Sequence, residues 1–102
     1  MKGLTTHVLD IVKGTGAAGM HVDVQVPGSR SFTITLDEIG RATLVEELEA
    51  GAYELRFHAA SYRQAAEFYD IIPVRILVHD PAQHYHVPLI LSAYGYSTYR
   101  GG

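Results

Sequence analysis

The sequence predicts an all-β protein: one antiparallel β-sandwich of about eight strands with one short helix. Several short segments alternate apolar and polar residues with the period of two that a half-buried strand requires. Glycine and proline residues separate these segments at even spacing, and only one stretch carries helix signals. No repeat, linker or low-complexity tract divides the 102 residues, so we expect a single domain over residues 1–102.

Three strands are expected in the first third of the chain. The first is Leu4–Ile11, and the loop that follows it is rich in glycine. The second, Met20–Val26, alternates most cleanly, with its methionine and valines expected inward. A turn at Pro27-Gly28-Ser29 leads to the third, Phe32–Leu36, whose apolar residues alternate with threonines.

The middle of the chain is less regular. A polar link with Gly40-Arg41 comes first, and Thr43–Leu48 then fits either a strand or a helical turn. Gly51 introduces a clear strand that would place three large apolar side chains on one face, namely Tyr53, Leu55 and Phe57.

The helix is expected after this strand. Ser61 and Gln64 have the spacing of a capping box, in which each side chain satisfies a free backbone N–H of the first turn. Ala65, Ala66 and Phe68 supply apolar contacts on one side. We expect about two turns.

Two strands complete the chain. Pro73 opens the strand Val74–His79, and Asp80-Pro81 turns the chain into the last strand, His84–Ser92. Alternation gives this last strand an apolar face for the core and a second face with two imidazoles. Pro88 cannot donate to a ladder, which favours a position near a sheet edge or an interface. The residues beyond it are close enough to fold back over the strand.

Composition excludes several classes of function. A net charge of −3 offers no electrostatic attraction to nucleic acid or to an anionic membrane. The absence of cysteine excludes disulfides, thiol catalysis and cysteine-based zinc sites. The N-terminal residues lack the apolar run of a signal peptide, and no stretch approaches membrane-spanning length. We therefore expect a soluble cytoplasmic protein.

Histidines are the most suggestive candidates for chemistry. His7 within a strand and Arg41 within a link are, taken singly, ordinary surface residues. His84 and His86 converge on one patch, and a His-X-His pair is also half of a possible zinc site. The other histidines form no second short-spaced pair, so we expect no metal and no other cofactor.

Several motifs in order along the chain resemble the transthyretin-like 5-hydroxyisourate hydrolase family. They are Leu4-Thr5-Thr6-His7-Val8-Leu9-Asp10, Gly40-Arg41, Gly51-Ala52-Tyr53, His84-Tyr85-His86-Val87-Pro88 and the terminal Tyr99-Arg100-Gly101-Gly102. The resemblance implies the transthyretin-like (prealbumin-like) sandwich, with its helix between the fifth and sixth strands. It also implies a homotetramer, a dimer of dimers with sites at the dimer–dimer interface. The implied reaction is cofactor-free hydrolysis of 5-hydroxyisourate to 2-oxo-4-hydroxy-4-carboxy-5-ureidoimidazoline in urate breakdown.

The resemblance also implies which residues act. His7 and His86 would form an acid/base pair, since an imidazole titrates near neutral pH and can take a proton from water. Arg41 would anchor the substrate and stabilise negative charge. Tyr99, Arg100, Gly101 and Gly102 would wall the pocket and bind substrate. The family ends in serine where this chain has Gly102, so the hydroxyl of that serine is absent here.

Two other functions fit the sequence. A non-catalytic transthyretin-like protein would use the same channel to bind a small planar ligand. A fibronectin-like adhesion domain would share the sandwich but would need no convergence of histidine and arginine. The set His7, Arg41 and His86 favours the enzyme, and Gly102 modestly favours the binding protein.

Overall fold

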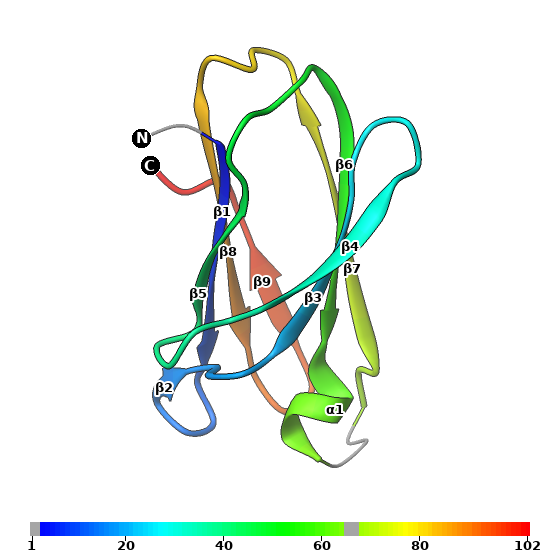
Figure 1. The fold of residues 1–102 in the computed structure, drawn as a ribbon. Helices are drawn as coiled ribbons and strands as arrows, with labels where there is room; N and C mark the ends of the chain where they lie inside the picture. Colours follow the sequence, from blue (N-terminus) through cyan, green and yellow to red (C-terminus); the bar gives the residue numbers. More distant parts are fainter. Residues whose placement is uncertain (1–2, 65–67) are drawn as a thin grey trace.

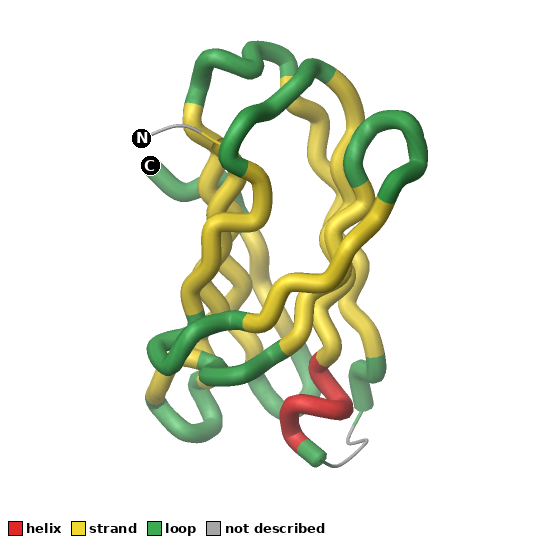
Figure 2. Tube along the Cα trace, in the orientation of Figure 1, coloured by secondary structure: helices red, strands yellow, loops and turns green. Residues whose placement is uncertain are grey.

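Two β-sheets lie face to face in this chain, as predicted (Figure 1). The computed structural model describes residues 3–64 and 68–102. The first sheet contains β1 (Gly3–Asp10), β2 (Thr15–Gly16), β5 (Arg41–Val45), β8 (His84–Leu91) and β9 (Tyr96–Thr98). The second contains β3 (His21–Gln25), β4 (Ser31–Thr35), β6 (Gly51–His58) and β7 (Ile71–Val78). Figure 2 shows the helix α1 (Ala59–Arg63) at one end of the sandwich.

Strand β1 is the centre of the first sheet. It pairs with β5 on one side and with β8 on the other, and its last two residues, Leu9 and Asp10, also pair with β2. The β1–β8 pair is parallel and runs in register from Gly3 opposite His84 to Asp10 opposite Leu91. The other strand pairs among the described residues are antiparallel, so an antiparallel sandwich has one parallel pair at its centre.

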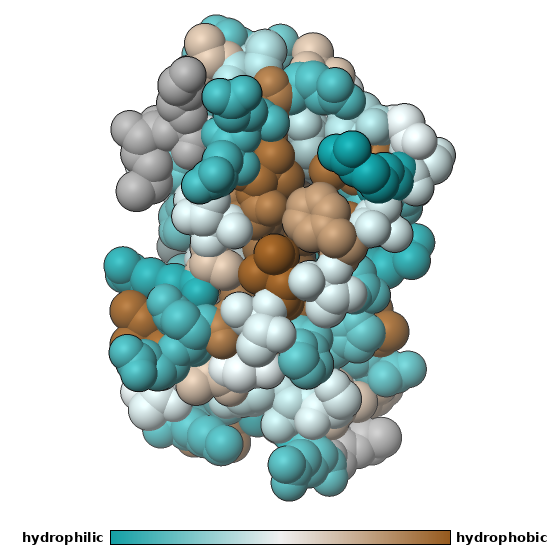
Figure 3. Space-filling view, in the orientation of Figure 1, coloured by the Kyte–Doolittle hydropathy of each residue, from teal (hydrophilic) through white to brown (hydrophobic). Residues whose placement is uncertain are grey.

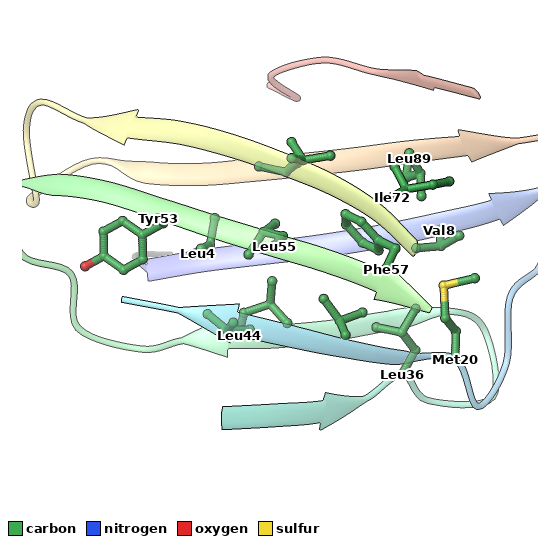
Figure 4. Packing of buried hydrophobic residues seen from close by; sticks show 14 of the residues in the cluster. Leu4, Val8, Met20, Leu36, Leu44, Tyr53, Leu55, Phe57, Ile72 and Leu89 are labelled. Atoms are coloured by element: carbon green, nitrogen blue, oxygen red, sulfur yellow. The ribbon is translucent and has the colours of Figure 1, made fainter. Parts of the chain in front are cut away.

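The core lies between the sheets and is built from the alternating residues of both. In Figure 4 Leu4, Val8 and Leu89 from the first sheet point toward Leu55, Phe57 and Ile72 from the second. The apolar faces expected from the sequence are confirmed, since the inward residues of 20–26, 53–57 and 85–91 are all buried. On the face seen in Figure 3, apolar surface gathers between β5 and β4, where partly buried side chains pack against the core.

The helix differs from its prediction. It begins at Ala59, directly after β6, with no side-chain hydrogen bond at its N-terminus, and it ends at Arg63. Ser61 therefore lies inside the helix and the predicted capping box is wrong. The cause is tertiary, because Ala59 is buried in the core where β6 ends and the strand continues straight into the turn. Ala65 and Ala66 lie outside the described residues, and Phe68 is exposed rather than packed on the helix.

Two further boundaries differ from expectation. Of the two readings of Thr43–Leu48 the strand is correct, but β5 already begins at Arg41, which the sequence placed in a link. Pro73 lies inside β7 instead of opening it, opposite Arg56 of β6. A proline is tolerated there because β7 is the edge strand of its sheet.

Pro88 lies in β8, the strand next to the edge strand β9, which agrees with the predicted position near a sheet edge. Strand β8 has β1 on one side, while β9 pairs with Leu89–Leu91 on the other. A bridge between His86 and Gly101 continues the β9 pairing in the same register, so the ladder is interrupted only around Pro88, which has no N–H to donate. The expected folding back of the C-terminal residues over β8 is confirmed.

Helices long and apolar enough to span a membrane are absent from residues 3–64 and 68–102.

Candidate active site

The outer face of the first sheet brings together residues that are far apart in the sequence. On β1, Thr5 and His7 alternate with the core-facing Thr6 and Val8 and so point to the outer face, where Thr5 is covered by neighbouring side chains and His7 is partly exposed. The strand register places Thr5 opposite His86 of β8, and His7 opposite Arg41 of β5. Parallel pairing with β8 and antiparallel pairing with β5 therefore assemble the two histidines and the arginine on one surface.

A pocket of about 350 Å³ opens on this surface. Its walls include Thr5, Arg41, His84, His86 and Gly102, together with Asp37 from the turn before β5. His7 does not line this pocket in the single chain. It lines another hollow, of about 370 Å³, with residues farther along β1 and with Ile39.

The two histidines of β8 share one hydroxyl group. Thr5 Oγ1 lies 2.8 Å from Nε2 of His84 and 2.8 Å from Nδ1 of His86. The two rings are nearly parallel, with centroids 6.1 Å apart and an angle of 26° between their planes. His84 is thus part of the pocket wall and of the His86 hydrogen-bond network.

The environment of His86 favours its neutral form. Partial burial lowers the pKa of His86 below its usual 6.5, and the positive charges of His84, His7 and Arg41 lower it further. A contact with the backbone of Thr5 acts in the opposite direction but is weaker. A neutral imidazole in a polar pocket is the form that can take a proton from water.

His7 is oriented by the turn that precedes β5. Its Nε2 lies 3.0 Å from the carbonyl oxygen of Ile39, which can only accept, so Nε2 carries the proton. When the ring is neutral, Nδ1 is then the free acceptor. The turn therefore sets the tautomer of His7 as well as the direction of the ring.

Asp37 holds this turn together. Its Oδ1 accepts hydrogen bonds from the backbone N–H groups of Arg41, at 2.9 Å, and of Ile39, at 3.0 Å. These two bonds lower the pKa of Asp37, and the positive charges of Arg41 and His7 add to the effect.

The same turn requires glycine at position 40. Gly40 has a φ of +79°, and a Cβ there would lie 2.6 Å from the carbonyl oxygen of Val8. Only glycine lets the turn lie against β1 and set Arg41 opposite His7.

The C-terminal residues divide between two places. The backbone N–H of Gly101 donates to the carbonyl oxygen of His86 at 2.8 Å, and Gly102 lines the pocket. Arg100 instead places its guanidinium 4.2 Å from the ring centroid of Tyr85 and donates to the carbonyl oxygen of His84 at 3.2 Å. With Tyr99 it lines a separate hollow of about 540 Å³ between β7 and β8. Tyr99 and Arg100 are therefore not brought to the His86 pocket within one chain.

The pocket has the groups that hydrolysis of an activated amide requires: a neutral imidazole, a second imidazole nearby and a guanidinium. In the described part of the chain, groups of three or more His, Cys, Asp or Glu side chains that could hold a metal ion are absent.

Sequence reasoning missed two residues of the pocket wall, Thr5 and Asp37. Thr5 stands two residues before His7, on the same strand face. Asp37 stands three residues before Gly40 and two before Ile39, the spacing of an Asx turn.

Comparison with known proteins identifies the family. A family model described as HIUase/Transthyretin family matches residues 4–101 of this chain. The chain belongs to this family. It is 43% identical to the 5-hydroxyisourate hydrolase of Deinococcus radiodurans over an alignment of 113 residues, which covers 97% of this chain and 95% of that protein. The alignment is longer than the 102-residue chain, so the Deinococcus protein has residues that this chain lacks.

Solved structures of the family share its fold. The 5-hydroxyisourate hydrolase of Klebsiella pneumoniae superposes with a TM-score of 0.86 at 27% identity, over 100% of both chains. Sea bream transthyretin in complex with thyroxine superposes with a TM-score of 0.82 at 24% identity, over 96% of this chain and 93% of that one, which speaks for the fold alone. The transthyretin-like sandwich expected from the sequence, and the resemblance to the hydrolases of this family, are both confirmed.

Proposed function

We propose that this protein hydrolyses 5-hydroxyisourate to 2-oxo-4-hydroxy-4-carboxy-5-ureidoimidazoline, as a step of urate breakdown and without a cofactor. The observation that carries the proposal is the convergence of His86, Arg41 and His7 on one face of the first sheet, in a chain that is 43% identical to a 5-hydroxyisourate hydrolase. A binding protein of the same fold would not require this set of residues.

The proposed mechanism assigns the base to His86. Neutral at neutral pH, it takes a proton from a water molecule as the water attacks a ring carbonyl of the substrate. Arg41 offers a planar pair of donors to the substrate and stabilises the charge that develops on the carbonyl oxygen. His7 lies on the same sheet face, with Nε2 held by Ile39 and Nδ1 left as an acceptor, and it orients water or substrate.

The C-terminal residues close the site in this proposal. Gly101 holds the strand of His86 through its backbone, and Gly102 forms part of the wall that substrate contacts. We assign Tyr99 and Arg100 an indirect role within one chain: Arg100 fastens the segment onto β8 by stacking on Tyr85. Direct contact of either residue with substrate would require a neighbouring subunit.

A homotetramer, arranged as a dimer of dimers, completes the proposal. Ile11 and Ile39, which line the hollow at His7, are more than half exposed, as is Val12 next to Ile11 in the chain, and a second subunit covering them would close the site. The edge strands β7 and β9 also carry exposed apolar residues, including Leu77 at 59% and Tyr96 at 40%. Light scattering at micromolar concentration should give the tetramer mass; a monomer mass would contradict this assembly. The cytoplasmic location expected from the sequence stays a prediction.

The deciding experiment follows the decay of freshly generated 5-hydroxyisourate by ultraviolet absorbance with and without the protein. We expect rapid decay with the wild type and a loss of about 10²- to 10⁴-fold in kcat for His86→Asn, which keeps polarity but cannot transfer the proton. Arg41→Lys should also reduce kcat, because an ammonium group cannot reproduce the bidentate fork. Binding of substrate analogues without acceleration of the decay would instead favour the non-catalytic carrier.

A further inference from the structure

One hydroxyl group lies between two imidazole rings in the wall of the pocket. The Oγ1 atom of Thr5 is 2.8 Å from a ring nitrogen of each of His84 and His86. Thr5 is only 9% exposed, so water competes little for its hydroxyl. A threonine with only a structural role on a strand needs one hydrogen-bond partner for its hydroxyl, whereas the Thr5 hydroxyl has two, and both are imidazole bases.

The number of protons limits how this network can be arranged. A hydroxyl carries one proton, so Thr5 donates to one imidazole and must accept from the other. In the first arrangement, Nδ1–H of His86 donates to Thr5 and Thr5 donates to Nε2 of His84, which leaves a free lone pair on Nε2 of His86. In the second, Nε2–H of His84 donates to Thr5 and Thr5 donates to Nδ1 of His86, so Nε2 of His86 carries a proton. The same heavy-atom positions serve both arrangements.

We propose that Thr5 and His84 form a proton relay that serves His86 in the reaction proposed above. Starting from the first arrangement, Nε2 of His86 takes the proton of the attacking water while the water oxygen bonds to the substrate carbonyl carbon. The Nδ1 proton of His86 passes to Oγ1 of Thr5, and the hydroxyl proton of Thr5 passes to Nε2 of His84. His84 then carries protons on both nitrogens and releases the one on Nδ1 to solvent.

The relay ends in the second arrangement, which prepares the next step. Nε2–H of His86 can now donate to the ring nitrogen that leaves when the carbon–nitrogen bond breaks. As it does so, the two transfers run in reverse and Nδ1 of His84 takes a proton from solvent, which restores the first arrangement. His86 thereby acts first as a base and then as an acid, and it holds no net positive charge between the two steps.

The surroundings of His86 make such a relay useful. Burial and the nearby charges of His84, His7 and Arg41 disfavour a lasting positive charge on this ring, as its lowered pKa shows. His84 can pass the proton on, because among the described residues its Nδ1 has no hydrogen-bond partner and its side chain is half-buried. The relay also supplies a proton path that does not need a hydroxyl at position 102, where this chain has glycine.

The test uses single substitutions in the full-length protein. Thr5→Val replaces the hydroxyl with a methyl group, whereas Thr5→Ser keeps the hydroxyl. His84→Ala removes the far end of the relay. Thr35→Val is the matched control, because it deletes a similar threonine–histidine hydrogen bond, 2.9 Å to His21, in the other sheet.

We expect kcat to fall at least about tenfold for Thr5→Val and His84→Ala, with KM nearly unchanged, because proton transfer and not binding is lost. Thr5→Ser should restore most of the kcat that Thr5→Val loses, and Thr35→Val should stay within about twofold of wild type. Added imidazole should restore part of the kcat of His84→Ala, by accepting the proton from Thr5, but none of the kcat of Thr5→Val. A merely structural role for His84 would give no such rescue.

Two results separate the failure of the relay from the failure of the function. Wild-type protein that does not accelerate the decay of 5-hydroxyisourate would overturn the proposed function, and the relay with it. An active wild type whose Thr5→Val variant keeps near-normal kcat, or whose His84→Ala variant is not rescued by imidazole, would overturn the relay alone. Nitrogen-15 NMR of His86 gives a check independent of turnover: the His84→Ala change should alter its tautomer balance when Thr5 is present and leave it unaltered in Thr5→Val.

Discussion

Glycine at position 101 is required by the position of the His86 ring, and its replacement gives the sharpest test of the site. A Cβ at Gly101 would lie 2.5 Å from Cδ2 and 3.2 Å from Cγ of His86, and 3.3 Å from Cγ of Pro88. Ordinary carbon–carbon contacts begin near 3.5 Å, so the Gly101→Ala change must displace the ring or the backbone by about 1 Å. Pro88 limits movement on one side, and the hydrogen bond to Thr5 is lost if the ring turns away.

A misplacement of about 1 Å at a catalytic group can cost about 10²-fold in rate, equal to about 2.7 kcal/mol of barrier. We therefore expect Gly101→Ala to lower kcat about 100-fold while the protein remains folded. Gly95→Ala is the control, because the nearest atom to its new methyl group would be Ser92 Oγ at 3.4 Å, an ordinary contact. Both variants would be assayed by the decay of 5-hydroxyisourate, with circular dichroism and light scattering to confirm fold and assembly. Equal kcat values for Gly101→Ala and wild type would show that the ring position does not limit catalysis.

Three further predictions follow from the same contacts. Gly102→Ser should change kcat little, since a Cβ there has no atom within 4 Å; a gain of tenfold or more, about 1.4 kcal/mol, would show that a hydroxyl is the missing proton carrier. Because the pKa of His86 lies below 6.5, the acid limb of the pH profile of kcat/KM should have its midpoint below 6.5, and a higher midpoint would argue against His86 as the base. Asp10→Asn should lower the free energy of unfolding by about 1–3 kcal/mol in urea titrations. Burial raises the pKa of Asp10, but the hydrogen bonds from Tyr62 and the backbone and the charge of Arg63 outweigh burial and lower the pKa overall. The loss of unfolding free energy in Asp10→Asn should therefore be full above about pH 4 and shrink in more acid solution, where the wild-type carboxylate is protonated. A loss that stayed independent of pH down to about 2 would contradict this.

Local patterns predicted the strands well, because strand alternation is a property of neighbouring residues. The apolar residues of 20–26, 53–57 and 85–91 had to face one way in an extended chain, and a core had to cover them. The helix shows where local patterns fail. The spacing of Ser61 and Gln64 fits a capping box with Ser61 as the N-cap, yet the N-cap is His58, three residues earlier, where the buried Ala59 fixes the end of β6.

The sequence by itself determined the residue types of the site, since His7, Arg41 and His86 stand in the motifs on which the resemblance to the family rests. Only the tertiary structure decided which side chains meet. Thr5 reaches both His84 and His86 because β1 and β8 pair in parallel register, and Arg41 lies opposite His7 because β5 starts at the turn held by Asp37. Tyr99 and Arg100 stand next to Gly101 in the sequence but lie at another hollow. Pairing register depends on hydrogen bonds between segments distant in the chain, and no pattern within one segment encodes it.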